Sequence, residues 1–371
     1  MSIISTVRIR LRDRLVRFYT DDLVRISRNR HSTRAFSLRR EHLKTEPLLP
    51  GQRQEILDFW KPYRNVEKEL SFFAFYNGAC DDKSQLKYYI PDRIYYSEID
   101  RFFSNVRHCE ILDDKNLYSL YFHDVNRPRT IIRKVNGELL DGNYQPLTID
   151  QAMACCVEER EVVMKEARLS LGGHGVHFYD LSHGPIEELK GRLLSEDNLV
   201  VQAVIRQHEC LNRIHDKSIN TIRIMSLFID GKVHILSSVL RMGRDGSRVD
   251  NASSGGIVCG ITENGTLKKC AFDKCGNSCT QHPQGLTFEG YKIEGYGRCR
   301  ELVTQLAGRF CTATKLISWD LAIGEDGEPI LIEANLTYGE LDFHQLCNGP
   351  IFGDMTMTQK ILSTVYCHRN K

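Results

Sequence analysis

The sequence contains no long hydrophobic run and no large excess of charge of one sign. Among its 371 residues there is no stretch of about 18 uninterrupted apolar positions, so a membrane-spanning helix is not expected. No apolar segment follows the basic start, which excludes a secretory signal. The formal net charge of +2 gives no case for nucleic acid as a partner. We therefore expect a cytoplasmic protein, either free or attached peripherally to the inner face of a membrane.

Internal repeats and low-complexity segments are also missing. Hydrophobic residues make up 41% of the chain and charged residues 26%, which is ordinary for a globular protein. The length predicts two or three domains. The 13 cysteines are scattered through a large chain, which favours reduced thiols over a disulfide framework.

Positive charge is concentrated near the start of the chain. Residues 1–45 contain few acids and many arginines, among them Arg8, Arg10, Arg12, Arg14, Arg39 and Arg40. Two interpretations are open. The segment is either a solvated helical face or a surface that meets an anionic partner, such as phospholipid headgroups, an acidic glycan or glycan-synthesis machinery.

The order of strand-like and helix-like runs predicts an α+β protein in four regions. These are a basic helical segment (1–45), an α+β region (46–110), a subdomain with a glycine-rich loop (111–205) and a C-terminal subdomain (206–371). Helices are expected near 52–63, 149–160 and 298–312. Strands are expected at 130–133, 161–165, 198–204, 221–229, 233–241, 316–322 and 329–334, and the run KYYIPDRIYY at 87–96 is strand-like.

The longest predicted strands form an antiparallel pair. TIRIMSLFI and KVHILSSVLR are joined by Asp230-Gly231, a strong hairpin signal. No G-x-G-x-x-G motif follows a first strand, so a parallel dinucleotide-binding sheet is not expected.

The sharpest chemical pattern lies in SWDLAIGEDGEPILIEAN. Asp320 interrupts one apolar strand, and Glu333 and Asn335 interrupt the next. A carboxylate inside an apolar strand is costly unless it is paired or bound to a cation. Glu333 and Asn335 are two residues apart and so share a face of a strand. Two carboxylates and an amide oxygen make a hard oxygen site suited to Mg²⁺. The alternative is the polar, solvent-facing edge of a hairpin.

A second pattern lies upstream, in VVMKEARLSLGGHGVHF. An apolar strand ends at Lys165, and a loop of small residues follows, with Ser170, Gly172, Gly173 and Gly175. Glycines let backbone N–H groups approach phosphate oxygens, and a lysine supplies the countercharge.

Two arginines lie near the ends of the predicted strands 221–229 and 233–241. Arg223 sits within an apolar run and Arg241 ends the next strand. Arginines placed beside a magnesium site can stabilise a transferring phosphoryl group. For Arg241, the end of an exposed strand is an equally ordinary place for an arginine.

A group of cysteines suggests a zinc site. Cys270, Cys275 and Cys279 precede His282, but the spacing lacks the paired C-x₂-C of structural zinc sites. Reduced thiols in a loop are favoured over zinc.

An aspartate on one strand, with E-x-N thirteen residues later on the next, resembles the ATP-grasp superfamily. The resemblance implies ATP and Mg²⁺ as cofactors, and a fold of two α+β subdomains that grip ATP behind an N-terminal extension. It assigns Asp320, Glu333 and Asn335 to the metal. Lys165 and the glycine-rich loop would contact the ATP phosphates. The backbone of Gln202, Ala203 and Val204 would meet adenine, with a polar residue near 207–209 reaching the ribose. Lys115 resembles a lysine that opens the ATP-binding region, although a surface lysine at a helix start fits it equally well.

Further segments resemble the sugar-transfer-associated ATP-grasp family. They are SINTIR, the V-D-N…G-G run, His282-Pro283 with GLTFEGYKI, and WD…E-x-N, in this order. The resemblance spans roughly residues 45–345 and makes Asp250, Asn251 and His282 candidates for the acceptor side. It implies a ligase that activates a carboxylate as an acyl phosphate and joins it to an amine.

The implied substrates can be arranged in two ways, and other activities compete. A sugar carboxylate of a surface polysaccharide could receive an amino acid or amine, or an amino-acid carboxylate could be joined to an amino sugar. The alternatives are a kinase that phosphorylates a sugar or alcohol, and a glycan-binding module with an inactive nucleotide site.

Overall fold

The structure is a computed structural model that describes residues 23, 27, 43–104, 109, 112–168, 175–182, 184–337 and 339–367. The chain divides into two compact units. One comprises Met1–Phe103, Cys275–Asn277 and Gly349–Lys371, and the other comprises Ser104–Lys274 and Ser278–Asn348. Most of the basic segment predicted for 1–45 lies outside the described residues. Among those that are described, no helix is both long enough and apolar enough to span a membrane.

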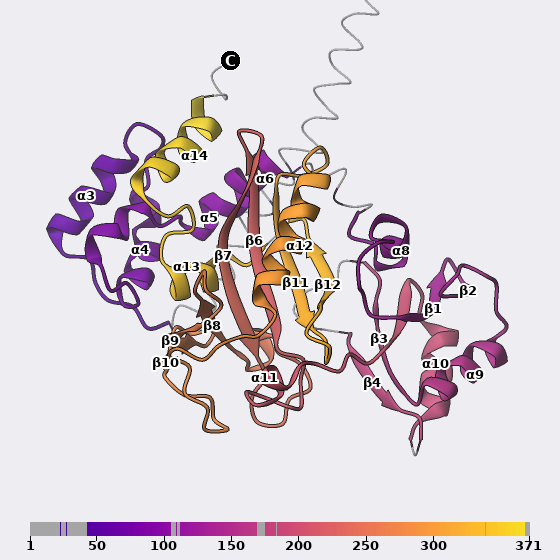
Figure 1. Cartoon of the computed structure of the whole chain (residues 1–371). Coiled ribbons are helices and arrows are strands. Elements are labelled where there is room, and N and C mark those ends of the chain that lie inside the picture. Colours follow the sequence, from indigo (N-terminus) through magenta and orange to yellow (C-terminus); the bar gives the residue numbers. More distant parts are fainter. Residues whose placement is uncertain are drawn as a thin grey trace, which may run out of the picture. The chain divides into compact units, whose positions relative to one another are not determined.

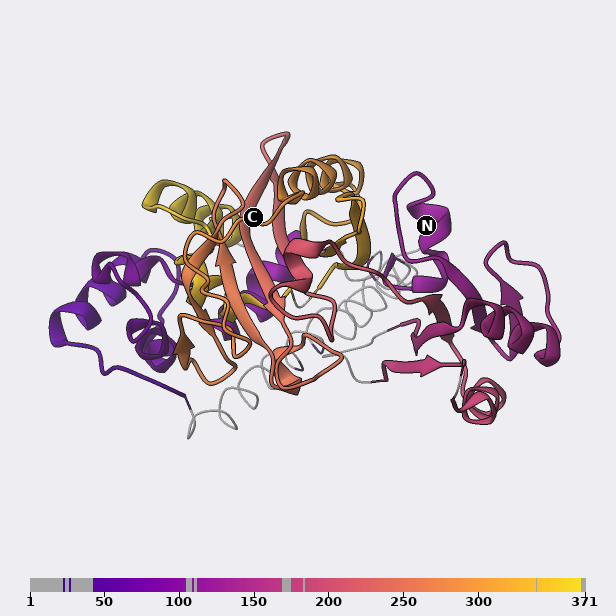
Figure 2. The same ribbon diagram turned by 60° about the horizontal axis from the view of Figure 1, so that its bottom comes forward.

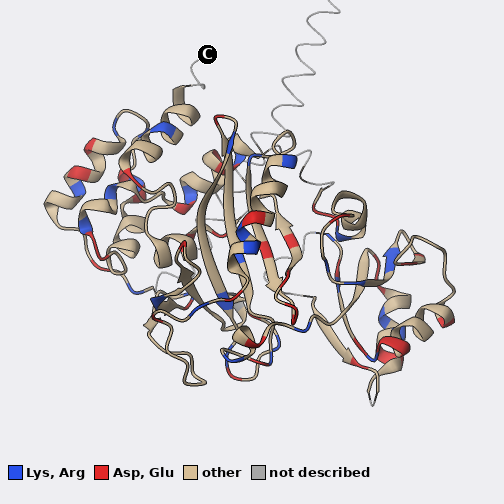
Figure 3. Ribbon diagram, viewed as in Figure 1, with Lys and Arg blue, Asp and Glu red and all other residues tan. Residues whose placement is uncertain are grey.

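The described part of the first unit is helical. At the start of its first helix, Leu49 N donates to Gln52 Oε1 at 2.9 Å. Trp60 at the end of that helix is fully buried, and its Nε1 donates to Lys87 O at 3.0 Å. Acidic and basic residues are mixed along these helices (Figure 3). The elements are α3 (Pro50–Trp60), α4 (Leu70–Asn77), α5 (Asp92–Ile94), α6 (Asp100–Phe103) and α14 (Met355–Cys367), with 3₁₀ turns at Glu67–Glu69 and Lys83–Tyr88 and a π turn at Tyr95–Ile99.

The strand expected at 87–96 is therefore wrong. Pro91 precedes α5 as its N-cap residue, and the chain continues as helix through the π turn. Tyr88, Ile90, Ile94 and Tyr95 are all buried. A continuous apolar run of this kind does not distinguish a strand from a helix that is covered on several sides.

The second unit contains a five-stranded antiparallel sheet, in the order β2-β1-β5-β3-β4 (Figure 1). Helices α9 and α10 pack against it, burying Met153, Cys156, Leu189 and Leu193 in its core. The elements are β1 (Thr130–Val135), β2 (Glu138–Asp141), α9 (Ile149–Glu159), β3 (Glu161–Glu166), β4 (His177–Asp180), α10 (Ile186–Ser195) and β5 (Leu199–Ala203). The 3₁₀ turn η5 (Lys115–Leu117) and α8 (Tyr118–Tyr121) precede β1.

The same unit contains a seven-stranded antiparallel sheet, in the order β10-β9-β8-β7-β6-β11-β12. Helix α12 lies along one face of it (Figures 1 and 2), where Val303 and Leu306 join the core. The elements are α11 (Glu209–Asn212), β6 (Thr221–Ile229), β7 (Lys232–Met242), η6 (Ala252–Ser254), β8 (Ile257–Ile261), β9 (Leu267–Phe272), β10 (Ser278–Cys279), α12 (Tyr296–Arg309), β11 (Leu316–Ile323), β12 (Pro329–Asn335) and α13 (Leu341–Asn348).

The predicted α+β class and the antiparallel hairpin are confirmed. Asp230 and Gly231 both have positive φ, 53° and 72°, as a two-residue turn between twisted strands requires. Every strand predicted from 130 onward is present within two residues of its expected ends.

We expect the stability of the second unit to depend strongly on Trp319. This side chain is fully buried against Phe122, and its Nε1 donates to Ser226 Oγ at 2.8 Å. Replacing Trp319 with Ala leaves a large cavity and removes the donor to Ser226 Oγ, and should lower the free energy of unfolding by about 3–5 kcal/mol. Urea unfolding followed by circular dichroism measures the change. Trp319→Phe should lose less stability, and an unchanged unfolding midpoint for Trp319→Ala would contradict the packing of Trp319 in the core.

Candidate functional site

A row of directly opposed polar residues spans three neighbouring strands of the seven-stranded sheet. Glu333 on β12 pairs with Asp320 on β11, which pairs with Arg223 on β6. Directly opposed residues project from the same face of a sheet. Asn335 lies opposite Ser318 one step along, and Arg241 on β7 lies opposite Thr221. The predicted metal residues and both predicted arginines therefore share one face.

The other face of these strands is apolar. Ile222, Ile224, Leu240, Trp319 and Leu321 alternate with the polar positions and are all fully buried in the core beneath α12. Strand alternation places the polar residues opposite that core. Figure 3 marks the acidic and basic positions in this sheet.

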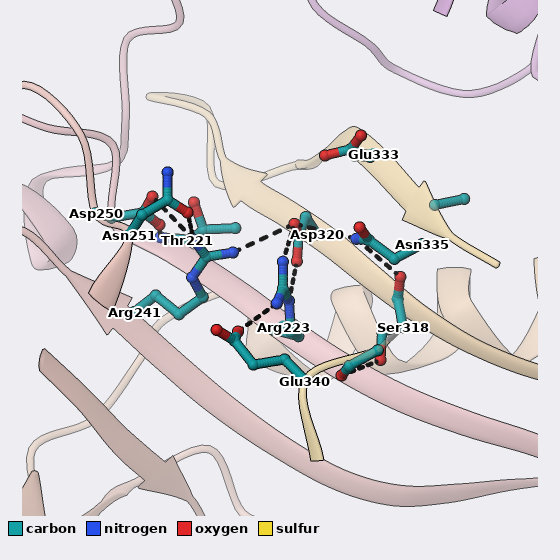
Figure 4. A network of polar contacts seen from close by, with 12 residues as sticks. Thr221, Arg223, Arg241, Asp250, Asn251, Ser318, Asp320, Glu333, Asn335 and Glu340 are labelled. Atoms are coloured by element: carbon teal, nitrogen blue, oxygen red, sulfur yellow. Dashed lines mark hydrogen bonds and ion pairs between the residues drawn. The ribbon is translucent and has the colours of Figure 1, made fainter. Parts of the chain in front are cut away.

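Asp320 is the centre of the polar face (Figure 4). Its Oδ1 accepts from Arg223 Nε at 2.7 Å and its Oδ2 from Arg223 Nη2 at 2.6 Å. Arg241 Nη1 lies 3.4 Å from Oδ2, and Asn335 Nδ2 donates to the same oxygen at 3.3 Å. Asp320 and both arginines are buried.

These contacts fix the charge of the network. Burial alone would raise the pKa of Asp320, but Arg223 and then Arg241 outweigh it and hold that pKa below its usual value. Burial alone would likewise lower the pKa of Arg223, and Asp320 and Glu340 raise it above the ordinary value. Asp320 is therefore ionised and Arg223 protonated at neutral pH.

Glu333 is held by Lys115. Lys115 Nζ donates to Glu333 Oε1 at 2.6 Å, across 218 residues of sequence. The interpretation of Lys115 as a surface lysine is wrong, because the residue is only 3% exposed. Asp114 accepts from Asn116 N to start the turn η5, and Lys115 N donates to Ala167 O just after β3. The lysine is thus fixed between the end of β3 and β12.

Lys165, on β3, interacts electrostatically with both Lys115 and Glu333. Burial, together with repulsion from Lys115, lowers its pKa to about 8, while Glu333 acts in the opposite direction. Of the predicted glycine-rich loop, Ser170, Gly172 and Gly173 lie outside the described residues. Gly175 is described, with a φ of 75° that favours glycine.

The predicted adenine-binding segment ends β5. Gln202 and Ala203 pair with β3 on one side, and Val204 follows the strand. The Ala203 amide already donates to Arg129 O at 2.9 Å, so this donor is not open to a base. Just beyond, the Gln207 side chain is fully used by backbone groups of residues 215–220 and the Asn220 side chain.

Two of the three predicted acceptor residues join the network through Arg241. Arg241 Nη2 bonds to Asn251 Oδ1 and lies 3.6 Å from Asp250 Oδ1, while Asp250 Oδ2 accepts from Thr221 N at 3.2 Å. His282 is not brought to this group. It is buried, with Nε2 bonded to Gly243 O at 2.9 Å and Nδ1 accepting from Gln284 N at 3.2 Å.

The cysteine pattern acquires no metal geometry. All 13 cysteines are free thiols. Within the described ranges, no three His, Cys, Asp or Glu side chains are grouped so that they could hold a metal ion. The predicted magnesium residues do not form such a group of three, because only Asp320 and Glu333 are acids and the third residue, Asn335, would contribute an amide oxygen.

The sequence reasoning did not identify Glu340 or His344. Glu340 forms an ion pair with Arg223 Nη1. His344 on α13 is fully buried with Nδ1 2.8 Å from Ser237 Oγ, and burial and then Arg223 lower its pKa to about 3, so it is neutral. The only local signal for Glu340 was an acid directly after Gly339, shortly beyond E-x-N.

Comparison with known proteins identifies a family. A family model described as sugar-transfer associated ATP-grasp matches residues 97–360, which is more than half of the chain. No curated protein matches.

Several solved structures are similar at low identity. D-alanyl-alanine synthetase A from Vibrio cholerae is 10% identical, with 69% of this chain and 66% of that chain covered and a TM-score of 0.44. L-amino acid ligase from Bacillus licheniformis is 15% identical over 70% and 48%, with a TM-score of 0.39. D-cycloserine synthetase is 16% identical over 82% of each chain, with a TM-score of 0.41. The chain thus spans less than two thirds of the length of the first two of these proteins.

Removing Arg223 should cost more than removing it together with Asp320. Arg223→Met leaves Asp320 buried with Arg241 as its remaining cation, and should lower the free energy of unfolding by about 3–5 kcal/mol. In the double variant Arg223→Met/Asp320→Asn, the incompletely neutralised carboxylate is gone, so part of this loss should return. A double-mutant cycle from urea unfolding measures the coupling. Strictly additive effects would contradict the ion pair.

Proposed function

The chain belongs to the sugar-transfer-associated ATP-grasp family, and we propose that it is an ATP-dependent carboxylate–amine ligase that uses Mg²⁺. The observation that carries the proposal is the set on one sheet face. Asp320, Glu333 and Asn335 lie in adjacent register, with Arg223 and Arg241 beside them and Lys115 reaching Glu333. Anionic ligands, a divalent cation and charge-stabilising arginines are what phosphoryl transfer requires.

The oxygen donors fit magnesium. Asn335 directs its Nδ2 to Ser318 O and Asp320, so its carbonyl oxygen is turned away from these bonds. Glu333 Oε2 accepts no hydrogen bond from the described residues. Asp320 Oδ2 already accepts from Arg223, Arg241 and Asn335, whereas Oδ1 accepts only from Arg223 Nε and keeps one lone-pair direction for a cation. When bound there, Mg²⁺ would neutralise phosphate charge.

The basic residues would bind the phosphates. Lys115 is almost fully buried, and burial also lowers the pKa of Lys165. Loss of surrounding water strengthens the interaction of both lysines with anionic oxygens. Arg223 and Arg241 are buried and held by acids, so they present preorganised donors where charge develops on the transferring group.

In the first step, the γ-phosphoryl group passes to a carboxylate oxygen and ADP leaves. In the second, an amine nitrogen attacks the acyl carbon, and the bond between that carbon and the phosphate oxygen breaks. The chain supplies position and charge rather than a covalent nucleophile. The family description supports a sugar-derived partner, namely a sugar carboxylate joined to an amine or an amino sugar joined to a carboxylate.

Lys115, Arg223 and Arg241 are already paired with acids of the chain. Asp320 contacts both arginines, and Glu333 contacts Lys115. Magnesium alone must compete with them, whereas ATP offers the cations new anionic partners. We therefore expect metal and nucleotide to bind strongly only together.

This expectation can be tested by thermal stability. A non-hydrolysable ATP analogue with Mg²⁺ at 100 times its Kd should stabilise the protein by about 2.7 kcal/mol, and Mg²⁺ alone should have little effect. Glu333→Gln should lose most of this stabilisation. Glu325→Gln, an exposed acid in the β11–β12 turn, is the matched control. An undiminished magnesium-dependent shift in Glu333→Gln would remove Glu333 from the metal site.

Lys165 gives a pH-dependent test. With a pKa near 8 it is about half protonated at pH 8, and a bound phosphate should raise that pKa. Binding of the magnesium–analogue complex at pH 8 should therefore take up about half a proton. Calorimetry in buffers of different ionisation enthalpy measures this uptake. Lys165→Met should abolish it, and the same uptake in that variant would exclude Lys165 as its source.

The stability of the ligand-free protein also depends on pH through Lys165. Because the folded-state pKa of Lys165 lies below the ordinary lysine value of 10.5, the unfolded chain binds more protons between about pH 8 and 10.5. This residue therefore makes stability rise with pH there.

A further inference from the structure

The loop between β12 and α13 is pinned to the polar face of the sheet. Ser318 Oγ donates to Gly339 O at 2.9 Å, and a Cβ atom at Gly339 would lie 2.4 Å from that hydroxyl. Only glycine allows this approach. The next residue, Glu340, has a φ of 59°, in the left-handed region of backbone conformation that residues other than glycine rarely adopt. The backbone thus holds Glu340 in one specific place.

Glu340 shares Arg223 with Asp320. Nε and Nη2 of Arg223 bond to Asp320, and Nη1 bonds to Glu340 (Figure 4). Figure 4 shows the two carboxylates on different sides of the guanidinium group. Any phosphoryl group that Arg223 stabilises would therefore have Glu340 as a near neighbour.

Of the four acids at the site, Glu340 is the most accessible. Its side chain is 30% exposed, against 6% for Asp320, 13% for Asp250 and 18% for Glu333. Asp250 has both oxygens engaged, by Thr221 N and Arg241. Glu340 Oε1 has no hydrogen bond recorded in the described part of the chain, so it can accept one from a ligand.

The local charge is suited to a cation. Asp250, Asp320 and Glu340 contribute three negative charges around the two positive charges of Arg223 and Arg241. Neighbouring His344 is neutral and adds no positive charge, and its buried Nε2 has no partner among the described residues. Within the ion pairs of Arg223 and Arg241, the acids exceed the cations by one charge, which favours a bound monocation beside Glu340.

We infer that Glu340 recognises the positively charged amino group of the second substrate. This rests on the proposed ligase function and specifies it. The nucleophile arrives as a primary ammonium group, carried by an amino acid or amino sugar, and not as an uncharged alcohol. Before attack the ammonium releases one proton to solvent. The nitrogen lone pair then forms the amide bond, the carbon–oxygen bond to phosphate breaks, and phosphate leaves with the second proton.

The test compares a charged nucleophile with a neutral one. The chain of 371 residues is incubated with ATP, Mg²⁺ and a panel of uronic acids and amino acids as carboxylates. Hydroxylamine is uncharged at neutral pH and converts any acyl phosphate to a hydroxamate. The hydroxamate is measured by the absorbance of its ferric complex. Parallel reactions contain amino acids or amino sugars as amines, and phosphate release gives KM and kcat.

Glu340→Gln should raise the KM for the cationic amine about 10- to 100-fold, because the carboxylate charge that pairs with the ammonium group is lost and only a weaker hydrogen bond to a neutral acceptor remains. Hydroxamate formation should fall much less, and Glu340→Asp should recover part of the KM. Glu325→Gln, the same exchange at an exposed turn, should leave both reactions unchanged.

The outcomes separate the two proposals. If the unmodified protein forms neither hydroxamate nor amide with any carboxylate, the ligase function fails and the role of Glu340 fails with it. If the unmodified protein is active and Glu340→Gln keeps the same KM for the amine, only the role of Glu340 is overturned. An equal loss of hydroxamate and amide would mean that Glu340 acts by positioning Arg223, which also overturns amine recognition.

Discussion

Asp320 is a buried carboxylate in the middle of a strand, and much of the polar face is arranged around its charge. An isolated ion in that position would be strongly unfavourable, so the sheet places Arg223 directly opposite and Arg241 within reach. The arginines in turn need further acids. Arg223 draws in Glu340, and Arg241 draws in Asp250 and Asn251. Through these contacts Asp320 organises two loops that are far apart in sequence.

Under the proposed function, the same contacts would give the site two states without a change of fold. In the protein by itself, each acid of the proposed metal set is neutralised by a cation of the chain. In the proposed complex with magnesium and ATP, the acids turn to the metal and the cations to the phosphates. Opposite charges would then exchange partners on one sheet face, which would keep the donors preorganised and limit the cost of reorganisation.

Backbone irregularities refine this arrangement. A bulge in β12 lies between the pairs Asp320–Glu333 and Leu321–Leu331. It turns Leu331 into the core and Glu333 to the polar face, although strict alternation would put both on one side. Gly339 and the left-handed Glu340 then direct the chain back over the sheet. These features decide which acids bind the proposed metal and which one remains open.

The sequence by itself determined the α+β class, the main strands and the hairpin at Asp230-Gly231, because these follow from local periodicity and turn chemistry. It also marked Asp320, Glu333, Asn335, Lys165 and Arg223, since charged residues in apolar strands are conspicuous. Only the tertiary structure decided that Lys115 is buried against Glu333, that His282 lies apart from the network and that Glu340 joins it. Local patterns do not encode which distant segments meet. Strand register, a bulge and the need to neutralise buried charge made those choices.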